Sequence, residues 1–234
     1  MRDTAPVRPG SLVLCHSPLT TAAAWGGLPD ELRHRGLRPL VLDVRSDERP
    51  PYAASYVADA SRQLAAGDPT APTVLVGHSG AGPLLPPLAA AARAARRPVG
   101  AYVFLDAMLP RAGGATRLEL LHSEDHGFAH ELQAQLERGG RYPDWDDEAL
   151  LALARPRDLG FFTEPLPHPS PDVLEWPDAP VGYLRTSEPY GWHTGIARQR
   201  RWPVVEVELG HFPGITAPAA AAGALAELLS ALPG

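Results

Sequence analysis

The chain of 234 residues contains no lysine, because all 21 of its Lys and Arg residues are arginine. A protein without lysine cannot form a Schiff base through a lysine amine, and it cannot have the phosphate-binding lysine of a P-loop. Its single cysteine, Cys15, excludes a disulfide bond within the chain. The sequence therefore excludes lysine-dependent carbonyl chemistry, P-loop nucleotide hydrolysis and a fold held together by internal disulfides.

Long hydrophobic segments are also missing. No apolar run approaches the roughly 20 residues that a membrane-spanning helix needs. The first ten residues, MRDTAPVRPG, hold no apolar stretch of the kind found in signal peptides. The net charge of −6 at pH 7 gives no reason to expect nucleic acid as a partner. We therefore expect a cytoplasmic protein that binds neither membranes nor nucleic acids.

Short apolar runs alternate with longer segments that have a helical pattern. Six runs are nearly continuous in apolar residues, which is typical of strands buried on both faces: 11–15, 38–43, 73–77, 100–106, 180–186 and 203–209. Helices are expected near residues 21–35, 53–66, 81–96, 191–201 and 217–232. This alternation predicts an α/β fold with a mostly parallel sheet of about six strands, flanked by helices.

One interval breaks the alternation. Residues 107–179 hold no convincing strand and contain two segments with a helical pattern, GATRLELLHSEDHGFAHELQAQLERGG and DWDDEALLALA. A long insertion between two strands of a sheet is often a lid over an active site. We predict that residues 1–110 and 176–234 form the α/β core, and that residues 111–175 form a helical lid inserted before the penultimate strand.

The segment TVLVGHSGAG, residues 73–82, reads as a buried strand that stops at a serine among small residues. A strand followed by small-x-Ser-x-small and a helix is the pattern of a nucleophile elbow. The serine of such an elbow occupies a strained turn, and larger side chains two positions before or after it would clash with the neighbouring strand and helix. Gly77 and Ala81 occupy these positions around Ser79, so we predict that Ser79 is an exposed nucleophile.

Two further segments strengthen this prediction. VELGHFPGI places His211 between the last predicted strand and the last helix, and LVLCHSPLTTAAAW follows the first strand. Together with the elbow, these segments resemble small, single-domain bacterial α/β hydrolases of the esterase and hydroxynitrile-lyase type, over nearly the whole chain. The resemblance implies the α/β-hydrolase fold, Ser79 as nucleophile and His211 as base. It also implies a small-molecule substrate, no cofactor, and a monomer or homodimer.

The third member of the catalytic triad is open to two interpretations. In the family that the chain resembles, the acid usually follows the strand before the histidine's strand, here VGYLRTSEPY. Glu188 is the only carboxylate of that segment, so we predict Glu188 as the acid. Some relatives place the acid after an earlier strand, which makes Asp106 at the end of YVFLD the alternative.

The oxyanion hole is expected to include the N–H of Gly80, directly after the nucleophile. The resemblance implies a second donor from the loop after the first strand. Direct alignment puts Pro18 at the donor position, and proline has no N–H. The second donor is therefore expected to be Leu19 or Ser17.

A set of residues in or beside the predicted lid, or next to the predicted catalytic groups, is expected to line an apolar substrate pocket: His16, Pro18, His78, Trp145, Phe161, Phe162, Trp176, Tyr190 and Trp192. Three other histidines, His122, His126 and His130, recur every four residues, a spacing that can bind zinc on one helix face. Gly127 interrupts that helix and the segment lies in the predicted lid, so we favour a solvated or pocket-rim helix face and predict no metal.

These features predict a serine hydrolase that cleaves a small or medium apolar ester, thioester or lactone. Two alternatives remain open. The same residues could support cofactor-free lyase, cyclisation or rearrangement chemistry, with Ser79 as a partner in proton transfer. The chain could also be a binding protein that keeps the pocket and has lost efficient catalysis.

Overall fold

The computed structural model describes residues 11–66, 71–111, 113–167 and 176–233, and its strands form one six-stranded sheet. The strand order is β2-β1-β3-β4-β5-β6, and every neighbouring pair is parallel. The strands are β1 (Ser11–Cys15), β2 (Pro39–Val41), β3 (Thr73–Ser79), β4 (Val99–Ala107), β5 (Val181–Arg185) and β6 (Val204–Glu206). The predicted parallel sheet is thereby confirmed.

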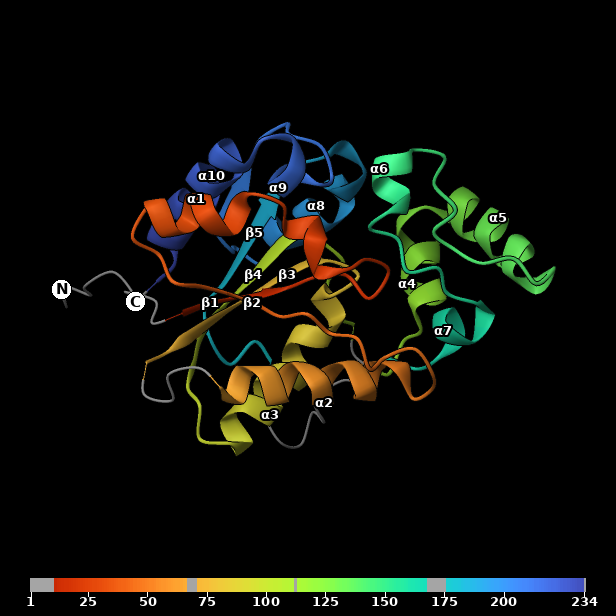
Figure 1. Cartoon of the computed structure of the whole chain (residues 1–234), viewed down its shortest axis with the longest axis horizontal. Helices are drawn as coiled ribbons and strands as arrows, with labels where there is room; N and C mark the ends of the chain where they lie inside the picture. The colour runs from red at the N-terminus through yellow and green to blue at the C-terminus, as the bar shows by residue number, and fades with distance from the viewer. Residues whose placement is uncertain (1–10, 67–70, 112, 168–175, 234) are drawn as a thin grey trace.

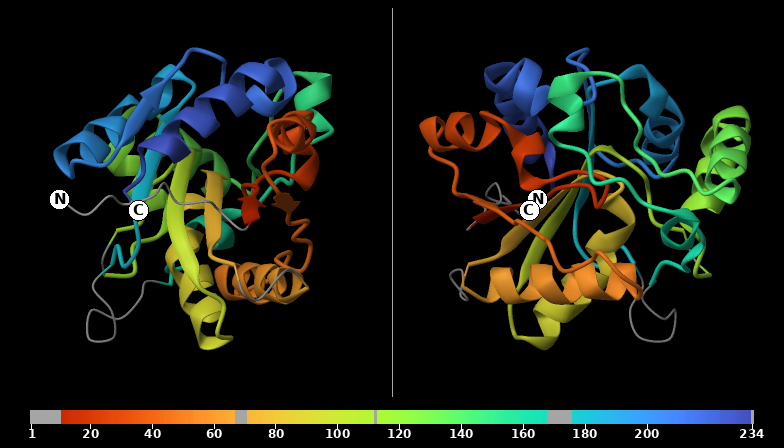
Figure 2. Two further views of the ribbon diagram at one scale, coloured as in Figure 1. Left: turned by 90° about the vertical axis from the view of Figure 1, so that its left-hand side faces the viewer. Right: turned by 45° about the vertical axis from the view of Figure 1, so that its right-hand side comes forward.

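Helices cover both faces of this twisted sheet (Figures 1 and 2). The α-helices of the core are α1 (Leu28–His34), α2 (Tyr52–Ala65), α3 (Leu85–Ala94), α8 (Gly191–Gln199), α9 (Pro213–Thr216) and α10 (Pro218–Ala231). The short 3-10 helices are η1 (Ala22–Trp25), η2 (Gly82–Leu84) and η3 (Glu188–Tyr190). Side chains of α1 and α10 pack on one face of the sheet, whereas side chains of α2, α3 and α8 pack on the other. The sheet is buried on both faces, which explains its apolar strands.

The helix expected over residues 21–35 is divided by a close contact between two loops. Gly26 and Gly27 separate η1 from α1, and Gly26 has a φ of 47°. A side chain at Gly26 would overlap the main-chain oxygen of Gly214, whose oxygen also accepts a hydrogen bond from the Gly27 N–H at 2.9 Å. This contact holds the segment after β1 against the segment that follows His211.

The last strand is shorter than the predicted span of residues 203–209. Regular pairing with β5 ends at Glu206, although the N–H of Val207 still donates to the Arg185 oxygen at 3.0 Å. The N–H groups of Leu209 and Gly210 both donate to the oxygen of Thr186, each at 2.9 Å. The chain thus leaves the sheet early and turns toward the end of β5, where His211 follows.

Between β4 and β5, the described residues form four helices: α4 (Arg117–Glu124), α5 (His126–Glu137), α6 (Glu148–Leu151) and α7 (Leu159–Thr163). We call them the cap helices; they lie beside the core at one end of the sheet in Figure 1. Three of them, α4, α5 and α7, share an apolar cluster with Tyr52 of α2, to which they contribute Leu118, Leu132 and Phe161, among others. The role of this region as a lid remains a prediction.

Buried ion pairs also attach the cap region to the core. Asp47, in the loop after β2, is completely buried and pairs with Arg155 at 2.7 Å and with Arg157 at 3.0 Å. Both arginines lie between α6 and α7. No helix within the described ranges is long and apolar enough to cross a membrane.

Candidate active site

The elbow around Ser79 has the strained geometry that its small residues predict. Ser79 ends β3 with a φ of 56°, in the left-handed region that non-glycine residues rarely occupy. A side chain at Gly77 would lie 3.0 Å from the Leu85 side chain, and one at Gly82 would overlap the main-chain oxygen of Met108. The tightest contact in the elbow is therefore at Gly82, three residues after Ser79. Ala81, where glycine is usual, is completely buried and its methyl group is accommodated there.

His211 reaches the elbow from the loop after β6. Gly210, with a φ of 81°, turns the chain just before it. His211 Nδ1 lies 3.4 Å from Oδ2 of Asp106, which is at the end of β4 and completely buried. Asp106 also has a left-handed φ, of 40°, so the strained backbone includes both Ser79 and Asp106.

The carboxylate of Asp106 has several further donors. Its Oδ1 accepts hydrogen bonds from the N–H groups of Thr186 at 2.6 Å and Ser187 at 3.2 Å, and its Oδ2 accepts one from the Ser187 hydroxyl at 2.5 Å. Burial alone raises the pKa of Asp106, but hydrogen bonds from His211, Ser187 and Thr186 outweigh it and leave the pKa below its ordinary value. Asp106 is therefore held as a charged carboxylate facing the histidine.

Glu188, the predicted acid, lies in a different position. It begins η3 and is exposed. No hydrogen bond or ion pair within the described part of the chain joins Glu188 to His211. The structure thus brings Asp106, the alternative, next to His211, because the chain after β5 turns the Thr186 and Ser187 N–H groups inward before Glu188 emerges at the surface.

Tyr190 lies between the predicted nucleophile and the predicted base. Its hydroxyl is 3.3 Å from Ser79 Oγ and 3.5 Å from His211 Nε2. Its ring is nearly parallel to the His211 imidazole, at 7°, with the ring centroids 4.9 Å apart. Burial raises the pKa of Tyr190 far above its ordinary value, so its hydroxyl remains protonated. The sequence predicted Tyr190 only as a pocket residue.

His78, adjacent to the serine in sequence, is buried beneath the His211 loop. Its Nε2 lies 2.7 Å from the main-chain oxygen of His211, and a carbonyl can only accept, so Nε2–H donates there. Burial, together with the charge of a protonated His211, lowers the pKa of His78 far below its ordinary value. His78 is thus a neutral support for the histidine loop, with 3% of its surface exposed.

The loop after β1 lies against Gly80. A side chain at Gly80 would lie 3.1 Å from the hydroxyl oxygen of Ser17, which is itself buried. That hydroxyl accepts a hydrogen bond from the N–H of Leu19 at 3.2 Å. The Gly80 N–H has no hydrogen bond to another described residue. Gly80 N–H is therefore available to a ligand, whereas Leu19 N–H is already engaged.

His16 and Pro18 are both buried and support this loop. His16 Nε2 accepts from the Val44 N–H at 3.1 Å, so Nδ1 carries the proton that is donated to the Ser17 oxygen at 2.8 Å. The Pro18 oxygen accepts hydrogen bonds from Arg157 at 3.1 and 3.2 Å. These groups fix the position of Ser17 relative to Gly80.

The predicted aromatic pocket residues are dispersed. Trp145 stacks edge to face on Phe212, directly after His211, at 5.6 Å between centroids. Phe161 and Phe162 are buried in the apolar cluster of the cap helices. Trp176 packs beside the main core, and Trp192 is 47% exposed. Among these five, Trp145 alone contacts the residue next to His211.

The three evenly spaced histidines lie at the junction of two cap helices. The helix is interrupted at Asp125, which separates α4 from α5 and caps α5 by accepting a hydrogen bond from the Phe128 N–H at 2.9 Å. Gly127, expected to interrupt the helix, instead lies within the first turn of α5. His122 and His126 approach each other at 3.3 Å. Within the described ranges, no three His, Cys, Asp or Glu side chains are arranged to hold a metal ion.

Some residues around the site had no distinctive sequence signal. Ser187 holds the Asp106 carboxylate, but its place in TSEPY does not distinguish it from an ordinary loop serine. His193 of α8 is buried beside Tyr190, with Nε2 2.7 Å from Oε1 of Glu124 on α4. These contacts depend on how the elements pack, which local patterns do not reveal.

Several known structures share this fold over nearly the whole length of the chain. The structure resembles a pyrethroid hydrolase from Sphingobium faniae, with 18% identity, a TM-score of 0.62, and coverage of 94% of this chain and 97% of that one. It also resembles an extracellular alpha/beta-hydrolase from a Paenibacillus species, with 17% identity, a TM-score of 0.69, and coverage of 94% and 99%. A third similar structure is a variant of tomato methylketone synthase I complexed with β-ketoheptanoate, with 16% identity, a TM-score of 0.66, and coverage of 93% of this chain and 96% of that one.

At these identities the likeness shows the fold alone, and a search of curated proteins finds no match. The sequence profile of the alpha/beta hydrolase family, however, matches residues 12–224, which span the sheet, the elbow and the histidine loop. The chain belongs to the alpha/beta hydrolase family.

Proposed function

We propose that the protein is a serine hydrolase that cleaves a small or medium apolar ester, thioester or lactone through an acyl-enzyme. The observation that carries the proposal is the contact of 3.4 Å between His211 Nδ1 and the buried Asp106 carboxylate, beside the strained Ser79. A buried carboxylate on Nδ1 orients the imidazole and stabilises its protonated form. Asp106 takes this role in our proposal in place of Glu188.

In the acylation step, Ser79 Oγ attacks the carbonyl carbon of the substrate, and His211 is the final acceptor of the serine proton at Nε2. Asp106 stays ionised throughout, since its hydrogen bonds hold its pKa low. The tetrahedral intermediate then expels the alcohol, thiol or tethered leaving group, which takes up a proton from His211. Water activated by His211 releases the acyl group and restores the enzyme.

The developing oxyanion needs two hydrogen-bond donors. The free N–H of Gly80 supplies one. Ser17 supplies the other through its side chain, because its hydroxyl oxygen already accepts the Leu19 N–H and its own proton is free to donate. This arrangement compensates for Pro18, which has no N–H at the position that usually donates.

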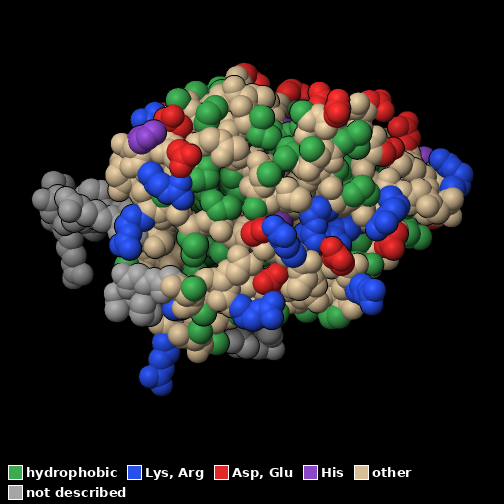
Figure 3. All heavy atoms as spheres, in the orientation of Figure 1, with side chains coloured by type: hydrophobic (Ala, Val, Ile, Leu, Met, Phe, Trp, Pro, Cys, Tyr) green, Lys and Arg blue, Asp and Glu red, His purple; other side chains and the backbone are tan. Residues whose placement is uncertain are grey.

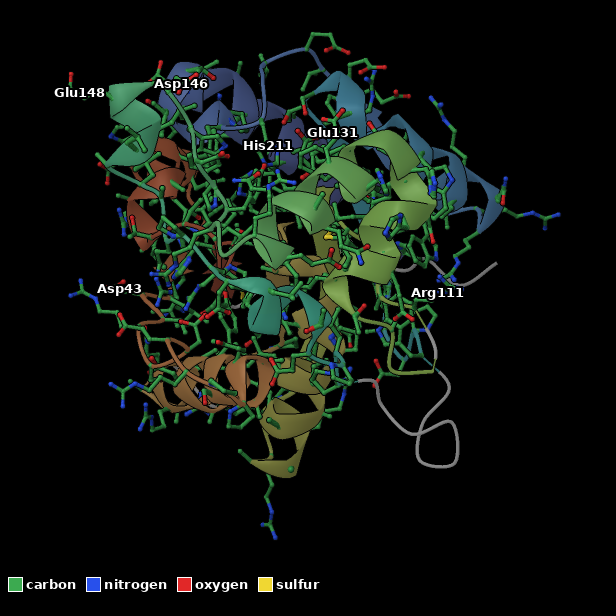
Figure 4. All side chains as sticks on the ribbon, turned by 90° about the vertical axis from the view of Figure 1, so that its right-hand side faces the viewer. Asp43, Arg111, Glu131, Asp146, Glu148 and His211 are labelled. Atoms are coloured by element: carbon green, nitrogen blue, oxygen red, sulfur yellow. The ribbon has the colours of Figure 1, made fainter. Side chains whose placement is uncertain are left out.

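Charge around the cap favours neutral substrates. Asp144, Asp146, Asp147 and Glu148 are exposed and flank Trp145 in the sequence. Figure 3 shows acidic side chains gathered along the upper right of the molecule, where α6 lies in Figure 1. Figure 4 labels Asp146 and Glu148 at the outer corner and His211 nearer the middle. Trp145 contacts Phe212, the residue after His211, so these carboxylates lie near the proposed site. Their negative charge repels anions, which supports an uncharged apolar ester over an acidic one.

A fluorophosphonate probe and a panel of p-nitrophenyl esters test the proposal together. We expect stoichiometric labelling at Ser79, turnover of short and medium acyl chains, and loss of both in Ser79→Ala. The alanine variant should keep the parental circular dichroism spectrum, because the hydroxyl contributes little packing.

Labelling without turnover of any ester would favour lyase or rearrangement chemistry at the same site. Absence of labelling would favour a binding protein. Ester turnover by Ser79→Ala at the parental rate would rule out the nucleophile.

A further inference from the structure

The contact between the nucleophile and the base is indirect. Ser79 and His211 are both described residues, and the structure shows no direct hydrogen bond between Ser79 Oγ and His211 Nε2. The Tyr190 hydroxyl lies between them instead, 3.3 Å from Oγ and 3.5 Å from Nε2. In ligand-free enzymes, catalytic hydrogen bonds are often this long and shorten when substrate binds.

The proton positions along this chain follow from Asp106. Because the Asp106 carboxylate can only accept, the Nδ1 facing it carries a proton, and Nε2 of a neutral His211 is left with its lone pair. The Nε2 lone pair lies in the imidazole plane, whereas the phenol stacks on the imidazole face, so the Tyr190 ring must tilt for its O–H to donate to Nε2. The phenol oxygen then accepts the Ser79 O–H, and the donors and acceptors point from serine to histidine.

Two ring contacts hold Tyr190 near this position. Its ring stacks on the His211 imidazole, and the His193 ring lies 6.1 Å away at 28°. Its main-chain oxygen accepts a hydrogen bond from the Thr194 hydroxyl at 3.0 Å. The main chain of Tyr190 is thus fixed at the start of α8. The same segment contains Ser187, whose hydroxyl donates a hydrogen bond to Asp106.

Building on the proposed function, we propose that Tyr190 is a catalytic residue that relays the proton from Ser79 to His211. As Oγ forms its bond to the substrate carbonyl carbon, the Ser79 O–H bond breaks and its proton passes to the phenol oxygen. The phenol O–H bond breaks in the same step, and that proton forms the N–H bond at Nε2. The carbonyl π electrons move onto the oxyanion, and Tyr190 remains a neutral phenol.

The test compares acylation rates of parent and Tyr190→Phe by stopped-flow release of p-nitrophenolate from p-nitrophenyl butyrate. The phenylalanine ring keeps the stacking on His211 and removes only the hydroxyl. We expect acylation to slow by about 100-fold or more, in the range typical of a lost proton-transfer group. The rate of Ser79 labelling by the fluorophosphonate probe should fall in parallel.

A second readout separates a relay from a structural role. Acylation rates of the parent are measured in mixtures of H₂O and D₂O. Two protons in flight give a curved dependence on the deuterium fraction, whereas one proton gives a straight line. We expect a curve for the parent and a straight line for the residual acylation by Tyr190→Phe.

Tyr102→Phe is the matched control. Its hydroxyl donates to Asp178 at 2.7 Å and accepts from Arg93 at 3.1 Å, away from the elbow. This variant should acylate at the parental rate, even if its melting temperature falls.

A straight line for the parent, or acylation by Tyr190→Phe within about threefold of the parental rate, would overturn the relay. Either result would show that the phenol hydroxyl takes no part in the proton transfer. The Ser79→Ala variant keeps the two proposals apart. If it turns over esters, the proposed function fails, whereas loss of activity in Ser79→Ala with full activity in Tyr190→Phe refutes the relay alone.

Discussion

At the residue scale, the acid of the site depends on which of two neighbouring carboxylates meets His211. Asp106 lies at the end of β4 and Glu188 follows the adjacent parallel strand β5, so the fold brings both to the same edge of the sheet. Asp106 receives donors from Thr186, Ser187 and His211, whereas Glu188 is exposed. Burial and hydrogen bonding, more than chain order, therefore distinguish the two residues.

We predict that Asp106→Asn lowers kcat by up to about 10⁴-fold, because the amide cannot stabilise a protonated His211 and favours the wrong tautomer. Glu188→Gln should leave kcat within a few-fold of the parental value. The measurement is kcat for both variants on one p-nitrophenyl ester at one pH. A larger loss in Glu188→Gln than in Asp106→Asn would contradict the assignment.

At the element scale, the turn from β3 into η2 is limited by the neighbouring strand. Gly82 packs directly against the main-chain oxygen of Met108, just after β4. A main-chain atom cannot move aside as a flexible side chain can, so the two elements must separate if a side chain is introduced. The position of Ser79 therefore depends on a residue three places beyond it.

We predict that Gly82→Ala destabilises the fold by about 2–4 kcal/mol, since overpacking next to a rigid main chain is among the costlier core changes. Acylation should also slow, because the elbow shifts. Gly195→Ala in α8 is the control, since nothing lies within 4 Å of its added methyl group. That change should stabilise the protein by about 0.5–1 kcal/mol through helix propensity. Urea unfolding measures both, and equal effects of the two variants would contradict the argument.

A second element-scale prediction concerns pH. Asp59 of α2 accepts hydrogen bonds from the N–H groups of Arg45 at 3.0 Å and Ser46 at 3.2 Å, in the loop after β2. Burial raises the pKa of Asp59, but hydrogen bonds from Arg45, Ser46, Gln63 and Arg62 outweigh it and lower the pKa well below its ordinary value. The stabilisation is therefore fully present above the unfolded-state pKa of about 4 and disappears as the pH falls through the lower folded-state value.

We expect Asp59→Asn to lower the free energy of unfolding by about 1–2 kcal/mol at pH 7, because hydrogen bonds to a charged acceptor are lost. The difference in free energy of unfolding between the parent and Asp59→Asn should decrease steadily below pH of about 4. Urea titrations at several pH values between 3 and 7 measure it, with Asp30→Asn, an exposed helix position, as control. A gap that stays constant over this range would show that the charge is unimportant.

The features that the sequence predicted correctly depend on local patterns, whereas the features that it did not predict depend on contacts between segments far apart in the chain. The apolar runs predicted the strands well, because burial on both faces leaves a local signal, and the elbow and His211 loop were visible as local motifs. The break at Gly26 and the short β6 were not predicted, since both depend on a distant loop that packs against them. The contact of Asp106 with His211 and the position of Tyr190 between Ser79 and His211 likewise arise only when β4, η3 and the His211 loop meet.

At the scale of the whole molecule, the cap region and the core are joined by buried charge. The fully buried Asp47 pairs with Arg155 and Arg157, and Arg157 also donates to the Pro18 oxygen. Arg157 therefore contacts both Asp47 of the core and the loop that contains Ser17. Disturbing the cap attachment should reach the proposed oxyanion hole.

We predict that Asp47→Asn destabilises the protein by about 3–5 kcal/mol, because the buried guanidinium of Arg157 and the partly buried one of Arg155 lose their charged partner. In the protein that remains folded, kcat should fall while labelling of Ser79 stays stoichiometric. Thermal melts and active-site titration measure the two effects. Arg33→Gln, which breaks only an exposed pair with Asp30, should change neither by a measurable amount. Loss of stability without any change in kcat would separate the cap attachment from the oxyanion loop.

The double role of Arg157 also limits how this enzyme could be recombined with its relatives. A chimera that receives a foreign cap between β4 and β5 would lose Arg155 and Arg157, so the carbonyl of Pro18 would lose its Arg157 donor and the carboxylate of Asp47 would lose both of its arginine partners. A foreign cap could then be introduced only together with replacements for these two arginines. The graft should therefore keep residues 155–157 of the host and exchange only the segment that precedes them.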